Sequence, residues 1–161
     1  MTDKLQLFKT TCQEHGIRLT HQRLVIFQAL VSLPGHPSAE DVYNRVRKAI
    51  PTMAFDTVYR TLATFEKINL IKRVKFADNR VRFDNNLSTH HHLVCTRCNR
   101  VEDFYWPDFD RLPDPDHLAG WGEMGTKHVE IRGLCRKCAA KCRKSRNAKH
   151  DRQLIMKKNQ Q

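Results

Sequence analysis

The stretch DTVYRTLATFEKINLIKRVKFADNRVRFD, residues 56–84, decides the fold of the first half of this chain. Val58, Leu62 and Phe65 recur at helical spacing, so we predict a helix that begins at Asp56, whose carboxylate can cap the first turn. The segments LIKRVKF and VRF are strand-like, and the turn-forming residues ADNR join them. This part of the stretch therefore predicts a β-hairpin.

The sequence predicts three helices before this stretch. Thr20 can cap one that ends before Pro34, and Ser38 with Asp41 resembles the capping box of the next, which should end at Pro51. The residues expected to be buried are Leu5, Phe8 and Cys12, then Val25, Ile26, Ala29 and Leu30, then Val42, Val46 and Ile50. Helices followed by a basic hairpin form the winged-helix arrangement, in which a recognition helix enters the major groove and the hairpin lies along the phosphates.

Tyr59 and Arg60 lie opposite the apolar stripe of the helix that begins at Asp56. Early, exposed residues of a recognition helix reach base edges, although this pair taken alone fits an ordinary surface helix equally well. The basic residues of the hairpin that could contact phosphates are Lys72, Arg73, Lys75, Arg80 and Arg82. The residues that we predict to bind DNA are Arg18, Thr57, Tyr59, Arg60 and Lys72.

The charge is spread unevenly along the chain. Residues 1–83 carry a formal charge of +7, residues 84–135 carry −4 and residues 136–161 carry +9, within a total of +12. This asymmetry favours a nucleic-acid partner for the N-terminal part, whereas the tail taken alone is more simply a solvated charge run. No apolar run approaches the roughly 20 residues of a membrane span. The stretch MTDKLQLFKTTCQEHG lacks the apolar region of a signal peptide, so we expect a cytoplasmic protein that does not bind membranes.

Two CxxC pairs, Cys95 with Cys98 and Cys135 with Cys138, have the spacing of paired zinc knuckles. Four thiolates in tetrahedral coordination suit Zn²⁺ and add folding energy to a small domain. Disulfides or redox thiols are the alternative, but the absence of a signal peptide and the CxxC spacing favour structural zinc. The two cysteines outside the pattern, Cys12 and Cys142, are expected to be free thiols.

The stretch THHHLVC, residues 89–95, raises the question of a second metal. Alternate residues of a strand share a face, so His90 and His92 point away from the side that carries His91. A zinc held by four sulfurs has no position left for these imidazoles, which resemble half of a second site completed by carboxylates. Asp84 before the hinge and Asp103 on a neighbouring strand are placed to join them. A surface cluster of histidines is the alternative.

The order of motifs along the chain closely resembles the ferric uptake regulator family of metal-dependent repressors. The motifs are RLTHQR (18–23), HPSAEDVY (36–43), TVYRTL (57–62), RFD (82–84), HHHLVCTRC (90–98), VEDF (101–104) and CRKC (135–138). The resemblance implies a homodimer with N-terminal winged helices that bind double-stranded operator DNA. It also implies a C-terminal α/β dimerisation domain.

The resemblance further implies a regulatory metal at the hinge, in addition to the structural Zn²⁺. Its ligands would be His36, Asp84, His90, His92 and Asp103. A metal bound by residues of both halves would fix their relative angle and so select the dimer that is competent to bind DNA. Five nitrogen and oxygen ligands leave a sixth position open and accept either Fe²⁺ or Mn²⁺.

The residue types of this ligand set favour one branch of the family. Zinc-uptake regulators typically use a cysteine in the sensing site, and iron-responsive members usually place Glu where Asp103 stands. Peroxide-responsive repressors place Asp there, and in them bound Fe²⁺ reacts with hydrogen peroxide and a ligand histidine is oxidised. The corresponding residues here would be His36 and His90. The alternative within the family is a repressor that responds to Fe²⁺ availability.

Several members of the family carry a further metal site in the dimerisation domain. Thr89 and His91 do not match its usual residue types, and His117 and His128 are loose candidates, so we do not expect this site here.

Two other classes of function explain less of the sequence. A metalloenzyme could use two histidines and carboxylates for non-haem iron, but no enzyme motif supports it, so we expect no enzymatic activity. A zinc-ribbon interaction module would leave His36, Asp84 and the helix–hairpin pattern unexplained. We therefore predict an α+β protein with a winged-helix domain at 1–84 and a hinge at 85–89. A metal-binding dimerisation domain should follow at 90–142, and a flexible basic tail at 143–161.

Overall fold

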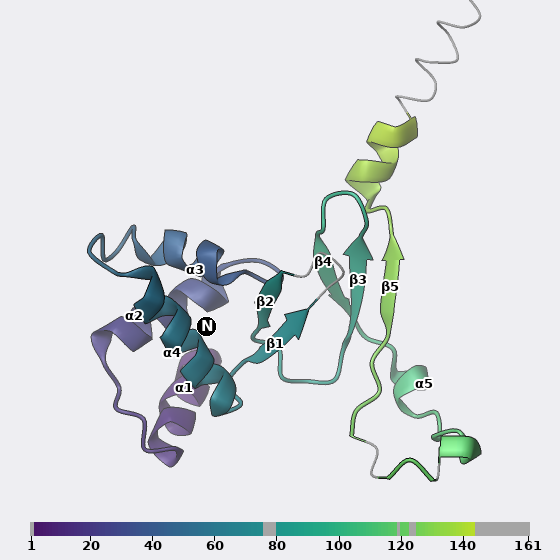
Figure 1. Ribbon diagram of the computed structural model, residues 1–161, viewed down its shortest axis with the longest axis horizontal. Coiled ribbons are helices and arrows are strands. Elements are labelled where there is room, and N and C mark those ends of the chain that lie inside the picture. Colours follow the sequence, from purple (N-terminus) through teal and green to yellow (C-terminus); the bar gives the residue numbers. More distant parts are fainter. Residues whose placement is uncertain (1, 76–79, 119, 123–124, 144–161) are drawn as a thin grey trace, which may run out of the picture. The chain divides into compact units, whose positions relative to one another are not determined.

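A computed structural model describes residues 2–75, 80–118, 120–122 and 125–143 of the chain. The backbone divides into two compact units, Met1–Thr89 and His90–Gln161. The first unit is helical with a two-stranded sheet, and the second is built on a three-stranded sheet (Figure 1). This is the mixed helix-and-strand fold that the sequence predicts. The expected basic tail lies outside the described residues, apart from Arg143.

Four helices make up most of the N-terminal unit: α1 (Thr2–Glu14), α2 (His21–Ser32), α3 (Ala39–Val46) and α4 (Phe55–Lys67). The predicted caps of two of them are confirmed. The hydroxyl of Thr20 accepts a hydrogen bond from the backbone N–H of Arg23, and Ser38 and Asp41 form a capping box. Each cap satisfies backbone N–H groups that a helix start leaves without partners.

Two predicted helix boundaries are wrong. α3 ends at Val46 rather than at Pro51, because the N–H groups of Lys48 and Ala49 bond to carbonyls three residues back and tighten the chain into a turn. α4 begins at Phe55, so Asp56 already lies within its first turn and makes no capping bond. The Asp56 carboxylate instead accepts a charged hydrogen bond from Arg60 at 2.8 Å.

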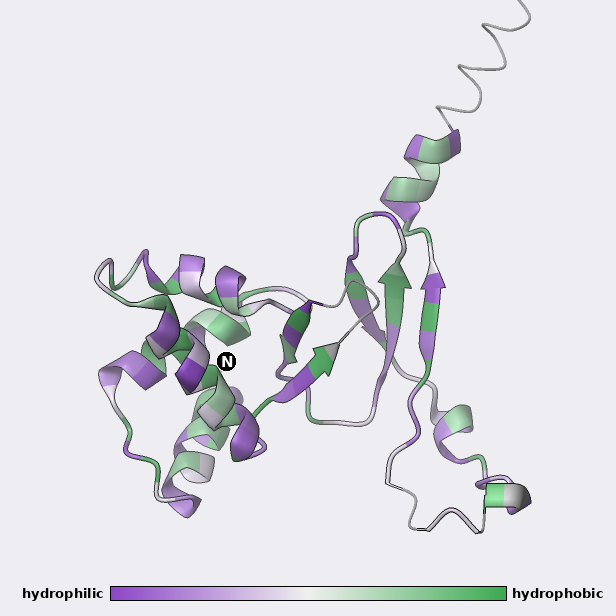
Figure 2. Ribbon diagram, in the orientation of Figure 1, coloured by the Kyte–Doolittle hydropathy of each residue, from purple (hydrophilic) through white to green (hydrophobic). Residues whose placement is uncertain are grey.

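Apolar side chains of the four helices pack into one core. The predicted stripe of α4 is confirmed, because Val58, Leu62 and Phe65 are fully buried. The Phe65 ring lies edge-on against Phe8 and Phe27, which stack on each other with ring centroids 4.6 Å apart. Figure 2 shows hydrophobic and hydrophilic residues interleaved along these helices, as amphipathic helices around a core require.

A short hairpin completes the N-terminal unit. β1 (Lys72–Lys75) pairs antiparallel with β2 (Val81–Asp84), and Lys72 lies opposite Asp84. Most of the predicted turn ADNR lies outside the described residues. The backbone N–H of Phe83 donates to the carbonyl of Pro37 at 2.9 Å, which ties β2 to the segment before α3. Helices followed by this hairpin give the predicted winged-helix arrangement.

The C-terminal unit is a sheet with strand order β4-β3-β5 (Figure 1). β3 (His91–Cys95) pairs antiparallel with β4 (Val101–Phe104) and parallel with β5 (Glu130–Gly133). A short helix α5 (Pro107–Asp110) and a 3-10 turn (Asp116–Leu118) lie between β4 and β5, and residues 136–143 are helical. None of the helices in the described part of the chain is long and apolar enough to cross a membrane.

Candidate metal centres and DNA-binding surface

The parallel pairing of β3 and β5 brings the two CxxC pairs to one edge of the sheet. Cys95 ends β3 opposite Gly133 at the end of β5, so both pairs follow strands that end side by side. Between β3 and β4 the chain turns tightly at Asn99, whose φ of 56° lies in the left-handed region that Asn tolerates. The carbonyl of Cys135 accepts the N–H of Ala139, so the second pair lies at the start of the helical residues 136–143.

The geometry of the four sulfurs fits zinc. The Sγ atoms of Cys95, Cys98, Cys135 and Cys138 lie within 4.8 Å of one another. The Sγ atoms of Cys98 and Cys135 are 3.8 Å apart. Sulfurs about 2.3 Å from a tetrahedral zinc would be about 3.8 Å apart, so the cluster has the size that the ion requires.

The thiols of this cluster differ in acidity. Backbone N–H groups of Cys135, Cys98 and Arg97 donate to the sulfur of Cys95 and lower its pKa to about 6. Burial, followed by the neighbouring thiols, raises the pKa of Cys138 to about 12. The cluster therefore stabilises a first thiolate but resists the ionisation of all four sulfurs. A bound dication supplies the positive charge that full ionisation needs.

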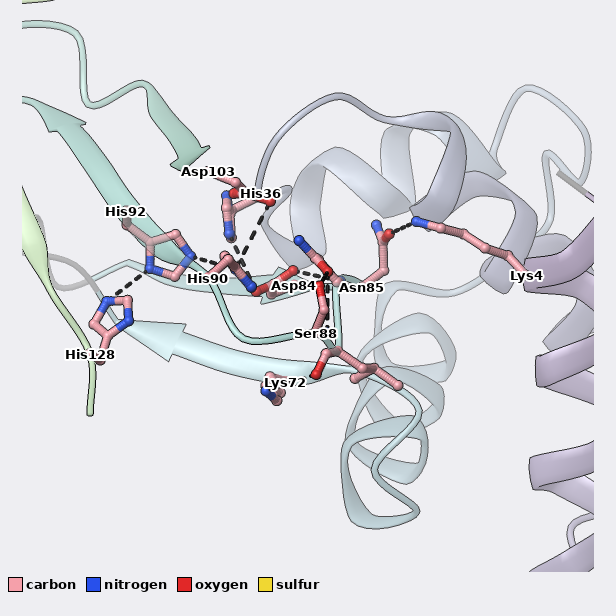
Figure 3. A network of polar contacts seen from close by, with 12 residues as sticks. Lys4, His36, Lys72, Asp84, Asn85, Ser88, His90, His92, Asp103 and His128 are labelled. Carbon is pink, nitrogen blue, oxygen red and sulfur yellow. Dashed lines mark hydrogen bonds and ion pairs between the residues drawn. The ribbon is translucent and has the colours of Figure 1, made fainter. Parts of the chain in front are cut away.

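Three donor groups of a second kind lie near the start of β3: His90 just before it, His92 within it and Asp103 on the neighbouring β4. The Nε2 atoms of His90 and His92 are 3.1 Å apart, and the Asp103 carboxylate lies 3.9 Å from Nε2 of His90. Asp103 is opposite His92 in the register of β3 and β4. These three residues offer ligand atoms within 4.8 Å of one another (Figure 3). The predicted common side of His90 and His92 is therefore confirmed.

The alternative of a surface histidine cluster is wrong. His90, His91 and His92 are 7%, 0% and 4% exposed. His91 faces a different set of groups from its neighbours: its Nδ1 accepts the backbone N–H of Val129 at 3.3 Å, and its Nε2 lies 3.3 Å from Asp110. The rings of Phe104 and Phe109 pack around it. The structure thus separates two buried imidazoles suited to a metal from one that is part of the packing.

The N-terminal unit contains a buried imidazole–carboxylate pair of its own. Nε2 of His36 lies 3.6 Å from the carboxylate of Asp84, and both side chains are buried. His36 lies two residues before the capping residue of α3, and Asp84 ends β2, so the Phe83–Pro37 bond described above holds the two segments together. Of the five ligands that the resemblance implies, two therefore lie together in one unit and three in the other.

The sequence did not predict that His128 contacts the donor group formed by His90, His92 and Asp103. Nε2 of His128 lies 3.1 Å from Nδ1 of His92. No sequence spacing relates two histidines 36 residues apart, and their approach follows from the parallel pairing of β3 with β5. Among the other residues considered for an additional metal site, the His117 side chain lies outside the described residues. The absence of that site stays a prediction.

Most of the residues that we predict to contact DNA have exposed side chains in the N-terminal unit. The Arg60 side chain is 80% exposed on α4, and Tyr59 is exposed beside it. Arg18 and Lys72 are also exposed, and Thr57 is half-buried. Arg73 pairs with Glu66 at 2.6 Å and is thus tied back to α4.

These features define a class of protein that joins a winged-helix unit to a small sheet unit with a four-cysteine cluster and a histidine–carboxylate donor group. A profile of the ferric uptake regulator family matches residues 14–120. The chain belongs to the ferric uptake regulator family.

Individual relatives agree with this assignment. The Peroxide operon regulator of Bacillus subtilis (strain 168) is 34% identical over 132 residues, which cover 81% of this chain and 90% of that protein. The Peroxide-responsive repressor PerR of Staphylococcus epidermidis is 31% identical, over 76% of this chain and 82% of that protein. The structure of the ferric uptake regulator from Francisella tularensis with iron has a TM-score of 0.65 at 27% identity, over 77% of this chain and 96% of that one.

Proposed function

We propose that this chain is a metal-dependent transcriptional repressor that binds double-stranded operator DNA as a homodimer and senses hydrogen peroxide. The observation that carries the proposal is the donor set, with His90, His92 and Asp103 in one unit and the buried His36–Asp84 pair in the other. The similarity to the peroxide operon regulator of B. subtilis supports the peroxide signal. Zn²⁺ at the four-cysteine cluster would be structural, and Fe²⁺ or Mn²⁺ would be regulatory.

The division of the five residues between two units suggests how the metal would regulate DNA binding. A ligand shifts a conformational equilibrium only by its different affinity for the two states. A metal that bound all five residues would have that property, because its affinity would be highest in an arrangement where both units supplied their ligands. Loss of one ligand would remove this preference and release the dimer from DNA.

The two oxidation targets would be His36 and His90. Bound Fe²⁺ would supply the redox chemistry that activates hydrogen peroxide, and the imidazole would be the group that is oxidised overall. Overall, the peroxide inserts one oxygen atom into a C–H bond of the imidazole and leaves one molecule of water. The product ring is a cyclic urea whose nitrogens carry hydrogen and offer no lone pair to a metal, so the ligand is lost. Mn²⁺ at the same residues would support DNA binding without this oxidation.

The test compares the Fe²⁺-loaded and Mn²⁺-loaded protein after a brief, low dose of peroxide. The DNA would be a duplex selected from a random-sequence pool with the Mn²⁺ form. We expect only the iron form to release this duplex, and mass spectrometry to find one added oxygen in the peptide with His36 or His90. If both forms stay bound and binding simply follows metal concentration, the protein is an Fe²⁺-availability regulator and the peroxide proposal is wrong.

The DNA surface can be tested by two matched substitutions. Arg60→Ala should weaken binding to the selected duplex by about 1–3 kcal/mol and reduce its preference over random DNA, because a base contact is lost. Lys72→Ala should weaken binding to the selected duplex and to random DNA alike. It should also reduce the slope of log affinity against log salt concentration by about one, because a phosphate contact is lost. Fluorescence anisotropy at several salt concentrations measures both effects. An equal loss on both duplexes for Arg60→Ala contradicts its role as a base reader.

A further inference from the structure

The imidazole of His92 is contacted on both of its nitrogens. Nε2 faces Nε2 of His90 at 3.1 Å within the donor group, and Nδ1 faces Nε2 of His128 at 3.1 Å. Figure 3 shows His128 on the far side of the His92 ring from His90. His92 is buried, whereas His128 is exposed. His128 is thus the neighbour of a candidate ligand without belonging to the set of donors around His90.

The backbone holds His128 in this place. It lies two residues before β5, and the next residue, Val129, is bound to β3 twice. The N–H of His92 donates to the carbonyl of Val129 at 3.0 Å, and the N–H of Val129 donates to Nδ1 of His91 at 3.3 Å. Two consecutive histidines of β3 therefore fix the same short segment. The contact between His128 and His92 thus lies where the parallel pairing of β3 with β5 begins.

The chemistry of the contact assigns a tautomer. A neutral imidazole that binds a metal through Nε2 carries its proton on Nδ1. In that tautomer the N–H of His92 would point at Nε2 of His128, which lies 3.1 Å away and can accept it when the proton of His128 is on its own Nδ1. Partners of this kind fix the ring orientation of metal-ligating histidines and increase their basicity as ligands.

We propose that His128 is a positioning residue for the regulatory metal: it accepts the Nδ1 proton of His92 and so presents the Nε2 lone pair to the ion. The inference rests on the proposed function for the identity of that metal. It assigns His128 a role through another residue, not a place among the ligands. Because the side chain is exposed, its replacement should leave the fold intact.

The first test uses the full-length, zinc-containing protein from which the weaker metal has been removed by a chelator. Binding of Mn²⁺ is measured from the electron paramagnetic resonance signal of the free ion. We expect His128→Leu to weaken Mn²⁺ binding by about 10–100-fold, the usual effect of losing such a partner. His128→Gln should restore most of the affinity, because its amide oxygen can accept the same proton. His15→Leu, an exposed histidine of the other unit, is the control and should change nothing.

The result that overturns the proposal is wild-type affinity in His128→Leu, or an equal loss in the Leu and Gln variants. A second measurement does not depend on metal loading. Nitrogen-15 spectra of the chelated protein should show His92 with its proton on Nδ1, and His128→Leu should shift it towards the other tautomer. If Mn²⁺ fails to bind even the wild-type protein, the proposed function fails, and the tautomer measurement alone decides the role of His128. An unchanged tautomer in the variant refutes that role.

Discussion

The two units bury different kinds of side chain. The core of the N-terminal unit is hydrocarbon, with fully buried rings and branched side chains such as Phe8, Leu30 and Phe65. In the described part of the C-terminal unit, the buried side chains are Val94 and Val101 together with two cysteines and three histidines. Apolar burial of about 25 cal/mol per Å² supports the first unit. The second has metal-binding groups where a core would be, so its stability should depend on the ion.

The largest effect on the C-terminal unit is expected when one sulfur of the four-cysteine cluster is removed. Cys98→Ser should release the zinc and unfold the sheet β4-β3-β5, because a structural zinc contributes about 10–16 kcal/mol of binding free energy in small zinc domains. That amount equals or exceeds the whole stability of a typical domain. Cys98 is exposed, so the loss is not one of packing. Zinc content and the dispersion of amide signals from residues 90–143 are the measurements.

Cys142→Ser is the matched control for this variant. Cys142 lies on the same helical segment as Cys138 but contacts Arg97, at 3.0 Å, instead of the cluster. The control should keep its zinc and its spectrum. If Cys98→Ser lost zinc yet kept dispersed signals for the sheet, the idea that the metal replaces a core would be wrong.

The N-terminal unit should respond instead to the loss of an aromatic ring. Phe65→Ala removes the ring that contacts both Phe8 and Phe27, and should lower the free energy of unfolding by about 3–5 kcal/mol through lost burial and a cavity. Lys67→Ala, on the exposed side of the same helix, should change it by less than about 0.5 kcal/mol. Urea unfolding followed by the helical circular dichroism signal measures both.

The same variant sharpens the comparison between the units. The zinc content of Phe65→Ala should equal that of the wild type, because all four sulfurs belong to the C-terminal unit. A loss of zinc in this variant would show that the cysteine cluster depends on the hydrocarbon core.

The parts of the fold that the sequence predicts correctly are those set by local spacing. The α4 stripe follows from residues three and four apart, and the Ser38–Asp41 capping box from a fixed spacing of three. Helix ends were less predictable: Asp56 looks like a cap in sequence, but the helix begins one residue earlier. A capping residue and a first-turn acid have similar sequence patterns, and only the backbone separates them.

In the candidate sites too, local spacing predicts some features, whereas contacts set by the pairing of distant strands are missed. The zinc cysteines are predicted by CxxC spacing, and the common side of His90 and His92 by strand alternation. The contact of His128 with His92 has no local signal, because it depends on which strand pairs with β3 and in which register. Arg73 is a similar case, since its pairing with Glu66 depends on how the hairpin packs against α4.

The smallest of the expected effects is a change in Mn²⁺ affinity, and it concerns two carboxylates that face adjacent histidines. Asp103 lies 3.9 Å from His90, and Asp110 lies 3.3 Å from His91. We expect Asp103→Asn to weaken Mn²⁺ binding about 10-fold or more, because a charged oxygen donor is lost from the group. Asp110→Asn should leave the Mn²⁺ affinity unchanged, since His91 is held by Val129 and aromatic rings rather than placed among the donors.

Titration of the chelated, zinc-containing variants with Mn²⁺ measures this difference, with zinc content as the check that the sheet is intact. The shorter distance belongs to Asp110, so proximity to an imidazole alone would predict the larger effect at Asp110. We expect the opposite order because His90, His92 and Asp103 offer their ligand atoms to one another on the same side of the sheet. Equal losses in the two variants would mean that the His91 side also binds the ion, and the separation of β3 into a metal-binding side and a packing side would have to be abandoned.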